Sequence, residues 1–176
     1  RTDGDKALLD LTERFDKVRL DSLKVTEEQM AMARASVSDE LVHELERAAE
    51  NIRRFHRMQQ SHGLWFQEVE PGIILGVKTT PLARVGAYIP GGRAAYPSTV
   101  LMCAVPAKVA GVRQVVCCTP PPVSALTLVA MQVAGVDEAY QVGGAQAVAA
   151  MALGTESIRP VDKIVGPGNV YVTAAK

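Results

Sequence analysis

The spacing of apolar residues predicts helices in the first part of the chain. Four of them recur at helical spacing near the N-terminus: Leu8, Leu11, Phe15 and Val18. Thr26 and Gln29 have the types and spacing of a capping box, in which each side chain hydrogen-bonds the backbone N–H of the other residue. Ser38 has the position of an N-cap before a longer amphipathic helix that Gly63 ends. A helical segment therefore opens the sequence.

Two apolar runs after this helical segment predict a β-hairpin. Residues 64–70 and 73–79 flank the turn Pro71-Gly72. Successive side chains of a strand point to opposite faces, so Trp65 and Phe66 fall on different faces of the hairpin. We expect at least one of these two rings to pack on the helices.

The remaining sequence repeats one unit: a short apolar strand, a turn rich in glycine or proline, and a helix of small residues. The strands are expected at residues 84–89, 114–118, 138–142 and 163–165. Strands that alternate with helices imply a parallel sheet with right-handed crossovers. The fold class is therefore α/β, with helices flanking the sheet. Pro106 lies inside the first of these helices and should kink or split it.

Charged residues are distributed unevenly along the chain. Residues 1–88 hold 13 basic and 15 acidic residues, whereas residues 89–176 hold 6 and 4. This fall in charge places a boundary near residue 85. We therefore divide the chain into a helical segment plus hairpin, residues 1–84, and an α/β portion, residues 85–176.

The composition argues against several classes of protein. The 19 basic and 19 acidic residues cancel, which disfavours a nucleic acid or a membrane surface as partner, because both attract a basic excess. The apolar stretches are too short to span a bilayer. Three cysteines, a small and odd number, do not form a disulfide framework and indicate a reducing cytoplasm.

Three glycine-rich turns are the candidate ligand-binding elements. In an open parallel sheet, ligands bind at the C-terminal ends of the strands, where helix N-termini offer free amides to phosphate. Each turn has a polar or aromatic side chain beside it, namely Tyr88, Gln146 and Asn169. Tyr88 could stack on a flat ring, and the two amides could bond ribose or amide groups. The spacing does not match a dinucleotide fingerprint, so the pattern alone leaves nucleotide binding and purely structural turns both open.

The other candidates for chemistry are weaker. Adjacent residues of a strand face opposite sides, so Cys117 and Cys118 are expected to be buried thiols and not a redox or metal pair. Cys103 lies in an apolar predicted helix and is also expected to be a buried thiol, although a catalytic role for it is left open. The three histidines, His43, His56 and His62, lack the spacing of zinc ligands. The sequence therefore contains no recognisable catalytic constellation and no metal site.

Several segments together resemble the histidinol dehydrogenase family. They are Tyr-Ile-Pro-Gly-Gly at residues 88–92, Gly-Gly-Ala-Gln-Ala at 143–147 and Gly-Pro-Gly-Asn at 166–169. The pair Phe15-Asp16 near the N-terminus also looks like that family. The resemblance covers essentially the whole chain, and these segments in this order are highly specific.

The resemblance implies a cytoplasmic enzyme of histidine biosynthesis. Such an enzyme oxidises L-histidinol to L-histidine through the aldehyde, with two NAD and a bound zinc, as an intertwined homodimer of incomplete Rossmann-like domains. The family's NAD contacts carry over onto Tyr88, Gln146 and Asn169. Its metal ligands and its acid–base pair lie downstream of the matching segments, so the resemblance assigns neither to this sequence.

We therefore expect an incomplete piece of such an enzyme that cannot oxidise histidinol by itself. We also expect Gln146→Ala and Asn169→Ala in the complete enzyme to weaken NAD binding with little loss of stability. Two alternatives stay open. One is an aldehyde dehydrogenase-like α/β oxidoreductase with a catalytic cysteine, and the other is a non-catalytic nucleotide-binding or assembly module.

Overall fold

The structure is a computed structural model that describes residues 2–60, 63–91 and 94–176. The chain begins with three helices and a hairpin: α1 (Gly4–Asp16), α2 (Glu27–Ser36), α3 (Asp39–Arg57), β1 (Leu64–Glu70) and β2 (Ile73–Lys78). Strands and helices then alternate: β3 (Arg84–Tyr88), α4 (Pro97–Val109), β4 (Gln114–Thr119), α5 (Ala125–Ala134), β5 (Glu138–Gln141), α6 (Gly144–Leu153), β6 (Lys163–Val165) and α7 (Val170–Ala175). The α/β fold class and the preceding hairpin are confirmed.

The four strands of the second part form one parallel sheet in the order β5-β4-β3-β6. From β3 the chain moves outward through β4 to β5 and then returns to the other side of β3 to place β6. This order is that of half a Rossmann fold, and the reversal between β3 and β6 is its topological switch point. The expected incomplete Rossmann-like sheet is therefore present.

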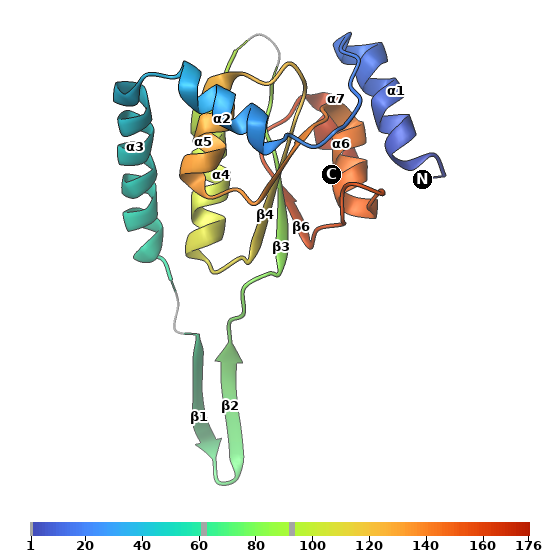
Figure 1. The fold of residues 1–176 in the computed structure, drawn as a ribbon. Coiled ribbons are helices and arrows are strands. Elements are labelled where there is room, and N and C mark those ends of the chain that lie inside the picture. Colours follow the sequence, from blue (N-terminus) through green and yellow to red (C-terminus); the bar gives the residue numbers. More distant parts are fainter. Residues whose placement is uncertain (1, 61–62, 92–93) are drawn as a thin grey trace.

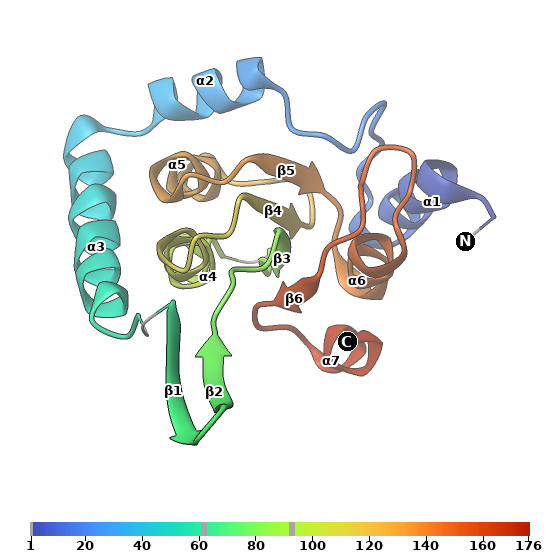
Figure 2. The ribbon, with the colours of Figure 1, turned by 90° about the horizontal axis from the view of Figure 1, so that it is seen from below.

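Helices cover both faces of the sheet, as Figure 2 shows. On one face lie α4 and α5, with α2 and α3 as an outer layer; on the other lies α6, with α1 and α7 beside it. Each face has its own hydrophobic cluster. Cys117 belongs to one cluster and Cys118 to the other, so the expected alternation of these buried thiols is confirmed.

Local capping explains where the helices of the first segment begin. Thr26 Oγ1 accepts from Gln29 N at 3.2 Å, and Gln29 Oε1 accepts from Thr26 N at 2.9 Å, which is the expected capping box. Ser38 Oγ accepts from Leu41 N and caps α3. Of the two effects expected at Pro106, the split is wrong because α4 continues to Val109, and the kink stays a prediction. A proline so close to the end removes one hydrogen bond from the last turns and leaves the rest of the helix intact.

The segment between α1 and α2 protects one edge of the sheet. The amide of Val25 donates to Ala139 O at 2.9 Å, and the amide of Gln141 donates to Leu23 O at 2.7 Å. These bonds give the outer side of β5 an antiparallel partner, which covers an edge that would otherwise invite association.

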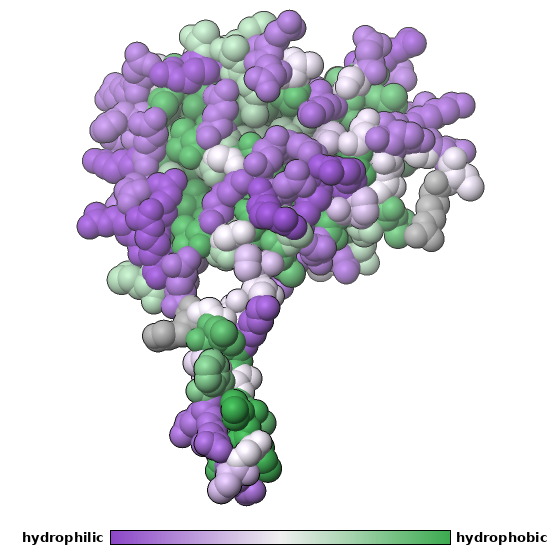
Figure 3. All heavy atoms as spheres, turned by 60° about the horizontal axis from the view of Figure 1, so that its bottom comes forward, coloured by the Kyte–Doolittle hydropathy of each residue, from purple (hydrophilic) through white to green (hydrophobic). Residues whose placement is uncertain are grey.

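The hairpin projects away from the body of the protein (Figure 1). Trp65 is 52% exposed and Phe66 is 69% exposed, so the expectation that one of them packs on the helices is wrong. The strands alternate as expected, but β1 and β2 extend beyond the reach of the helices and pair only with each other in their sheet. Figure 3 shows hydrophobic side chains exposed along the hairpin.

Helices from before residue 85 share a core with helices from after it. Ala33 of α2 and Leu45 of α3 belong to the same buried cluster as Leu101 of α4 and Val129 of α5. This arrangement explains why the first half of the sequence is richer in charge, because α2 and α3 form an outer layer with one face in water. The division at residues 84 and 85 stays a prediction.

Among the described residues, no helix is both long enough and apolar enough to cross a membrane.

Candidate functional site

A cavity of about 640 Å³ lies at the C-terminal ends of the parallel strands. Its walls come from the turn after each of β3, β4, β5 and β6 and from the end of α1. The lining residues are Phe15, Asp16, Tyr88, Gly91, Pro120, Gly144, Ala145, Gln146, Asn169 and Tyr171. The structure thus brings Tyr88, Gln146 and Asn169, the three residues expected from the sequence, into one cavity at the switch point of the sheet.

Tyr88 ends β3 and lies under the N-terminus of α6. Its hydroxyl accepts from Gly144 N at 3.2 Å and so caps a helix that has no side-chain N-cap of its own. Burial raises the pKa of this phenol. Only 5% of the residue is exposed, so the ring face that the sequence suggested for stacking is covered by the core. The hydroxyl remains able to donate one hydrogen bond toward the cavity.

Gln146 lies in the first turn of α6, and its side-chain amide folds back over Gly144. A Cβ atom at Gly144 would lie 2.6 Å from Gln146 Oε1, a contact that the flexible amide could relieve by moving. The φ of Gly144 is +66°, and this left-handed conformation is the reason that glycine is favoured there. The amides of Ala145 and Gln146 belong to the first helical turn, where no intrahelical acceptor exists. This wall of the cavity therefore offers backbone donors together with an adjustable side-chain amide.

Asn169 has a local structural role in addition to its place in the cavity wall. Its Oδ1 accepts from the amides of Tyr171 and Val172, both at 3.1 Å, and caps α7. The acceptor of this side chain is therefore occupied, and its Nδ2 donor is the group left for a ligand. The expectation that Asn169→Ala costs little stability needs correction, because loss of an N-cap typically costs about 1 kcal/mol.

The glycines of the turns are explained by contacts within the protein. A Cβ at Gly91 would lie 2.7 Å from Pro120 Cγ, and one at Gly143 would collide with the same proline. Gly166 has φ +113° and approaches the carbonyl of Tyr88 so closely that no side chain fits. Gly91 and Gly143 let their turns pack around Pro120, and Gly166 lets its turn pack on the end of β3. The glycines therefore have a structural role, and only the polar groups of the cavity indicate a ligand. Gly92 of the Tyr-Ile-Pro-Gly-Gly segment lies outside the described residues.

Two residues of α1, Phe15 and Asp16, line the cavity although no motif in the sequence predicts this role for them. Phe15 is 60% exposed and borders the opening, while Asp16 is partly buried. Asp16 Oδ2 is buried and has no hydrogen-bond partner among the described residues, and burial raises the pKa of this carboxyl. One feature of the sequence could have drawn attention to Asp16: it is an aspartate at the C-terminal end of a helix, where the helix dipole disfavours a negative charge.

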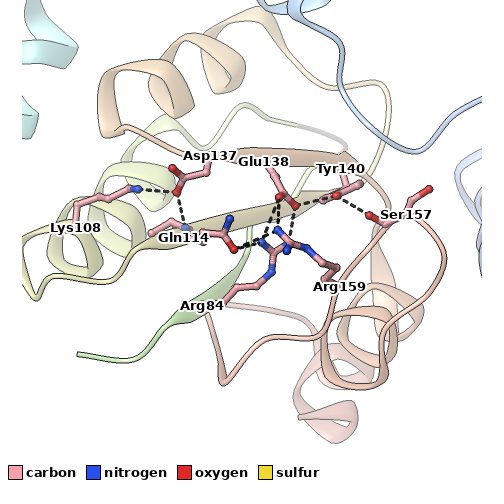
Figure 4. A network of polar contacts seen from close by, with 9 residues as sticks. Arg84, Lys108, Gln114, Asp137, Glu138, Tyr140, Ser157 and Arg159 are labelled. Carbon is pink, nitrogen blue, oxygen red and sulfur yellow. Dashed lines mark hydrogen bonds and ion pairs between the residues drawn. The ribbon is translucent and has the colours of Figure 1, made fainter. Parts of the chain in front are cut away.

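A second polar cluster lies at the opposite, N-terminal ends of the strands (Figure 4). Glu138 Oε2 accepts from Arg84 Nη2 at 2.5 Å and from the Tyr140 hydroxyl at 2.9 Å, and Glu138 Oε1 also accepts from Arg159. These partners, with Arg84 first, lower the pKa of Glu138 to about 2. Desolvation and the neighbouring carboxylate raise the pKa of Tyr140. The cluster is an internal ion-pair network that joins three strands.

The thiols and histidines have the properties of structural residues. Burial raises the pKa of Cys118 to about 12 and holds that of Cys117 well above its usual range. Burial also raises the pKa of Cys103, so a thiolate nucleophile is disfavoured at each position. His43 is exposed, His56 is partly exposed and His62 lies outside the described residues. Within residues 2–60, 63–91 and 94–176, no group of three His, Cys, Asp or Glu side chains could hold a metal ion.

The fold and the cavity define an α/β protein with a Rossmann-like parallel sheet and a ligand-sized cavity at its switch point. The family model for histidinol dehydrogenase matches residues 1–176. The chain therefore belongs to the histidinol dehydrogenase family.

Individual relatives agree with this assignment. The chain is 56% identical to a histidinol dehydrogenase from Methanosarcina mazei and 54% identical to one from Geobacillus kaustophilus, each over 180 residues. In both comparisons all of this chain aligns, with 42% of the relative. The crystal structure of histidinol dehydrogenase from Elizabethkingia anophelis superposes with a TM-score of 0.93 at 42% identity, over 98% of this chain and 40% of that one. The chain thus spans about two fifths of the length of these relatives.

Proposed function

We propose that this chain forms the NAD-binding part of an enzyme that oxidises L-histidinol to L-histidine through the aldehyde, as a step of histidine biosynthesis. The observation that carries the proposal is the single cavity that collects Tyr88, Gln146 and Asn169 from three separate turns. Membership of the histidinol dehydrogenase family supports the reaction and the substrate.

The groups in the cavity fit a dinucleotide. Its volume of about 640 Å³ is in the range of small-ligand and cofactor sites. The free amides at the N-terminus of α6 suit a phosphate, and Gln146 and Asn169 Nδ2 suit ribose or carboxamide groups. When bound, the nicotinamide ring supplies the hydride-accepting chemistry of the reaction. The residues of this chain bind and orient the cofactor, and none of them is proposed as the general base.

Zinc does not fit the described part of this chain. The residues that the structure describes contain no cluster of ligands, and the buried cysteines are held in their neutral form. We propose that the zinc and the acid–base pair of the full-length enzyme depend on other residues. The free, buried thiols are consistent with a cytoplasmic location.

We also propose that the enzyme is a homodimer and that the hairpin contacts the second copy. The register places Trp65, Ile73, Leu75 and Val77 on one face of the hairpin, and all four are at least 48% exposed. Because an isolated two-stranded hairpin is marginally stable in water, we expect this face to be covered. An arm that extends away from its own core can reach another copy of the chain (Figure 1).

The association can be tested by sedimentation of the full-length protein. We expect a dimer for the unsubstituted protein and a shift to monomer for the double variant Leu75→Glu, Val77→Glu. As a matched control, Glu68→Gln on the opposite face should leave the dimer intact. A monomeric unsubstituted protein, or a dimer unaffected by the double variant, would contradict the proposal.

The catalytic proposal is tested with purified full-length protein. We expect NAD binding in a calorimetric titration and reduction of NAD when L-histidinol is added. The 176-residue chain alone should show no turnover of histidinol. Absence of NAD binding by the full-length protein, or turnover by the chain alone, would overturn the proposal that this chain binds the cofactor and depends on other residues for catalysis.

A further inference from the structure

One wall of the cavity is the end of a helix that lies at the margin of the protein. The last two residues of α1 line the cavity, and the helix lies beside α6, apart from α2 and α3 (Figure 1, Figure 2). Leu8 and Thr12 are the buried residues of α1, at 5% and 0% exposure. Because this stripe on α6 is narrow, the position of the wall depends on what else holds the helix.

The first turn of α1 is attached to the loop that follows α6. Glu156 Oε2 accepts from the amide of Asp5 at 2.7 Å, and the Asp5 carboxylate accepts from the amide and the hydroxyl of Ser157. The N-cap residue of α1, Asp3, makes no capping bond with its side chain. A carboxylate 151 residues away therefore satisfies a free amide of the helix and lies at the positive end of its dipole. We call Asp5, Glu156 and Ser157 the clasp.

The loop that carries Glu156 and Ser157 is itself fixed to the body of the protein. Ile158 is 0% exposed, and the carbonyl of Ser157 accepts from the Tyr140 hydroxyl at 2.8 Å (Figure 4). The loop is also closed on itself, since the amide of Thr155 donates to Ile158 O at 2.8 Å. The clasp thus ties the helix to an anchored point, and α1 is the part that its loss would release.

The clasp and the cavity lie at opposite ends of the same two helices. α1 runs from the clasp at Asp5 to the cavity at Asp16, about 16 Å at 1.5 Å per residue. α6 runs in the reverse sense, from Gln146 at the cavity toward the loop that carries Glu156. If α1 tilts about its buried stripe, its two ends move in opposite directions. An attachment at the first turn therefore controls where the last turn lies.

We propose that Asp5, Glu156 and Ser157 are positioning residues for cofactor binding, which hold α1 so that its last turn keeps its place in the cavity wall. This assignment rests on the proposed function. The clasp touches no cofactor and acts only through α1. Suppose that its loss leaves α1 in this place for about a tenth to a third of the time. The apparent Kd for NAD then rises about three- to tenfold, because it equals the intrinsic Kd divided by that fraction.

The test compares Asp5→Ala with Asp10→Ala, the same change at an exposed position of the same helix, in the full-length protein. We expect Asp5→Ala to raise the Kd of NAD about three- to tenfold in a calorimetric titration. It should raise the KM for NAD and leave kcat at saturating NAD unchanged, because the clasp does not act on the chemical step. Asp10→Ala should change none of these values.

Two further variants show whether the clasp acts as a unit. Ser157→Ala should also weaken NAD binding, and the double variant with Asp5→Ala should bind no more weakly than Asp5→Ala alone, because both changes break the same contact. Glu156→Ala removes the acceptor of the α1 amide and should weaken binding, whereas Glu156→Gln keeps an acceptor oxygen and should retain most of the affinity.

Hydrogen exchange reports on α1 directly. Without cofactor, the amides of α1 should exchange faster in Asp5→Ala than in Asp10→Ala. Equal exchange in the two variants, unchanged NAD affinity in Asp5→Ala, or an equal loss of affinity in Asp10→Ala would overturn the assignment while the proposed function stands. Additive losses in the double variant, or a kcat that falls with the affinity, would overturn it in favour of a general structural role. An unsubstituted protein that does not bind NAD would overturn the proposed function as well.

Discussion

The two ends of the parallel sheet differ in whether their polar groups are paired within the protein. At the N-terminal ends, Arg84, Glu138 and Arg159 are joined in ion pairs, and Asp137 binds both Lys108 and the amide of Val115 (Figure 4). At the C-terminal ends, the strands open into a cavity beside free helix amides and beside Asp16, whose buried Oδ2 has no described partner. At the first end the charged side chains pair with one another, with Arg84 Nε as the one buried atom there that lacks a described partner, whereas the second end keeps free helix amides beside a cavity.

This contrast shows that a shifted pKa identifies a functional residue only together with its partners. The pKa of Glu138 falls to about 2 because Arg84 and other donors surround the carboxylate, and these partners account for it fully. The pKa of Asp16 rises because the group is desolvated without a partner. Of these two carboxylates, the one without a partner is the one that faces the cavity.

The largest predicted effect concerns the paired end of the sheet. The Arg84 side chain is only 8% exposed, so Glu138→Ala leaves a buried guanidinium without its carboxylate. We expect a loss of about 3–5 kcal/mol in the free energy of unfolding, measured with denaturant. The exposed pair of Glu44 and Arg47 provides a control, and Glu44→Ala should cost less than about 1 kcal/mol. Equal losses in the two variants would show that the network has no special role.

The sequence was sufficient to predict the sheet and the three turn residues of the cavity. Strand–turn–helix units leave few topologies, and the carboxyl ends of parallel strands meet at one edge, so Tyr88, Gln146 and Asn169 had to lie near one another. The helix caps at Thr26 and Ser38 were predictable because they depend on residues three positions apart.

The remaining features depend on long-range packing that no local pattern encodes. Asp16 reaches the cavity from a helix distant in sequence, and the partners of Glu138 lie on β3 and on the loop before β6. The predicted packing of the hairpin on the helices is the clearest failure. Alternation placed Trp65 and Phe66 on opposite faces correctly, but it contains no information on which surface covers either face.

An intermediate effect is expected from pH, with opposite signs at the two ends of the sheet. The folded-state pKa of Glu138 lies below its ordinary value of 4.5, so its stabilisation is present above pH 4.5 and is lost as the pH falls toward about 2. The full loss is on the order of 3 kcal/mol. The raised pKa of Asp16 has the opposite consequence, because acid removes a destabilising charge.

The measurement is the free energy of unfolding between pH 7 and pH 3 for the unsubstituted protein, Glu138→Gln and Asp16→Asn. Compared with the unsubstituted protein, Glu138→Gln should lose less stability in acid and Asp16→Asn should lose more. If the two variants shift the profile in the same direction, the contrast between paired and unpaired carboxylates is wrong.

The smallest effect predicted here concerns the donors of the cavity, and the cap at Asn169 decides how it must be measured. Asn169→Ala would remove both the cap and the donor, whereas Asn169→Ser keeps an oxygen that can cap α7 and removes only Nδ2.

We expect Asn169→Ser and Gln146→Ala each to weaken NAD binding in the full-length protein about tenfold, near 1.4 kcal/mol. Neither should lower the free energy of unfolding by more than about 0.5 kcal/mol, because no other described hydrogen bond depends on the deleted atoms. The exposed Gln132 of α5 provides the control, and Gln132→Ala should leave the affinity unchanged. Unchanged NAD affinity in both site variants would mean that the turns only hold the strands together, and the difference between the two ends of the sheet would then be one of packing alone.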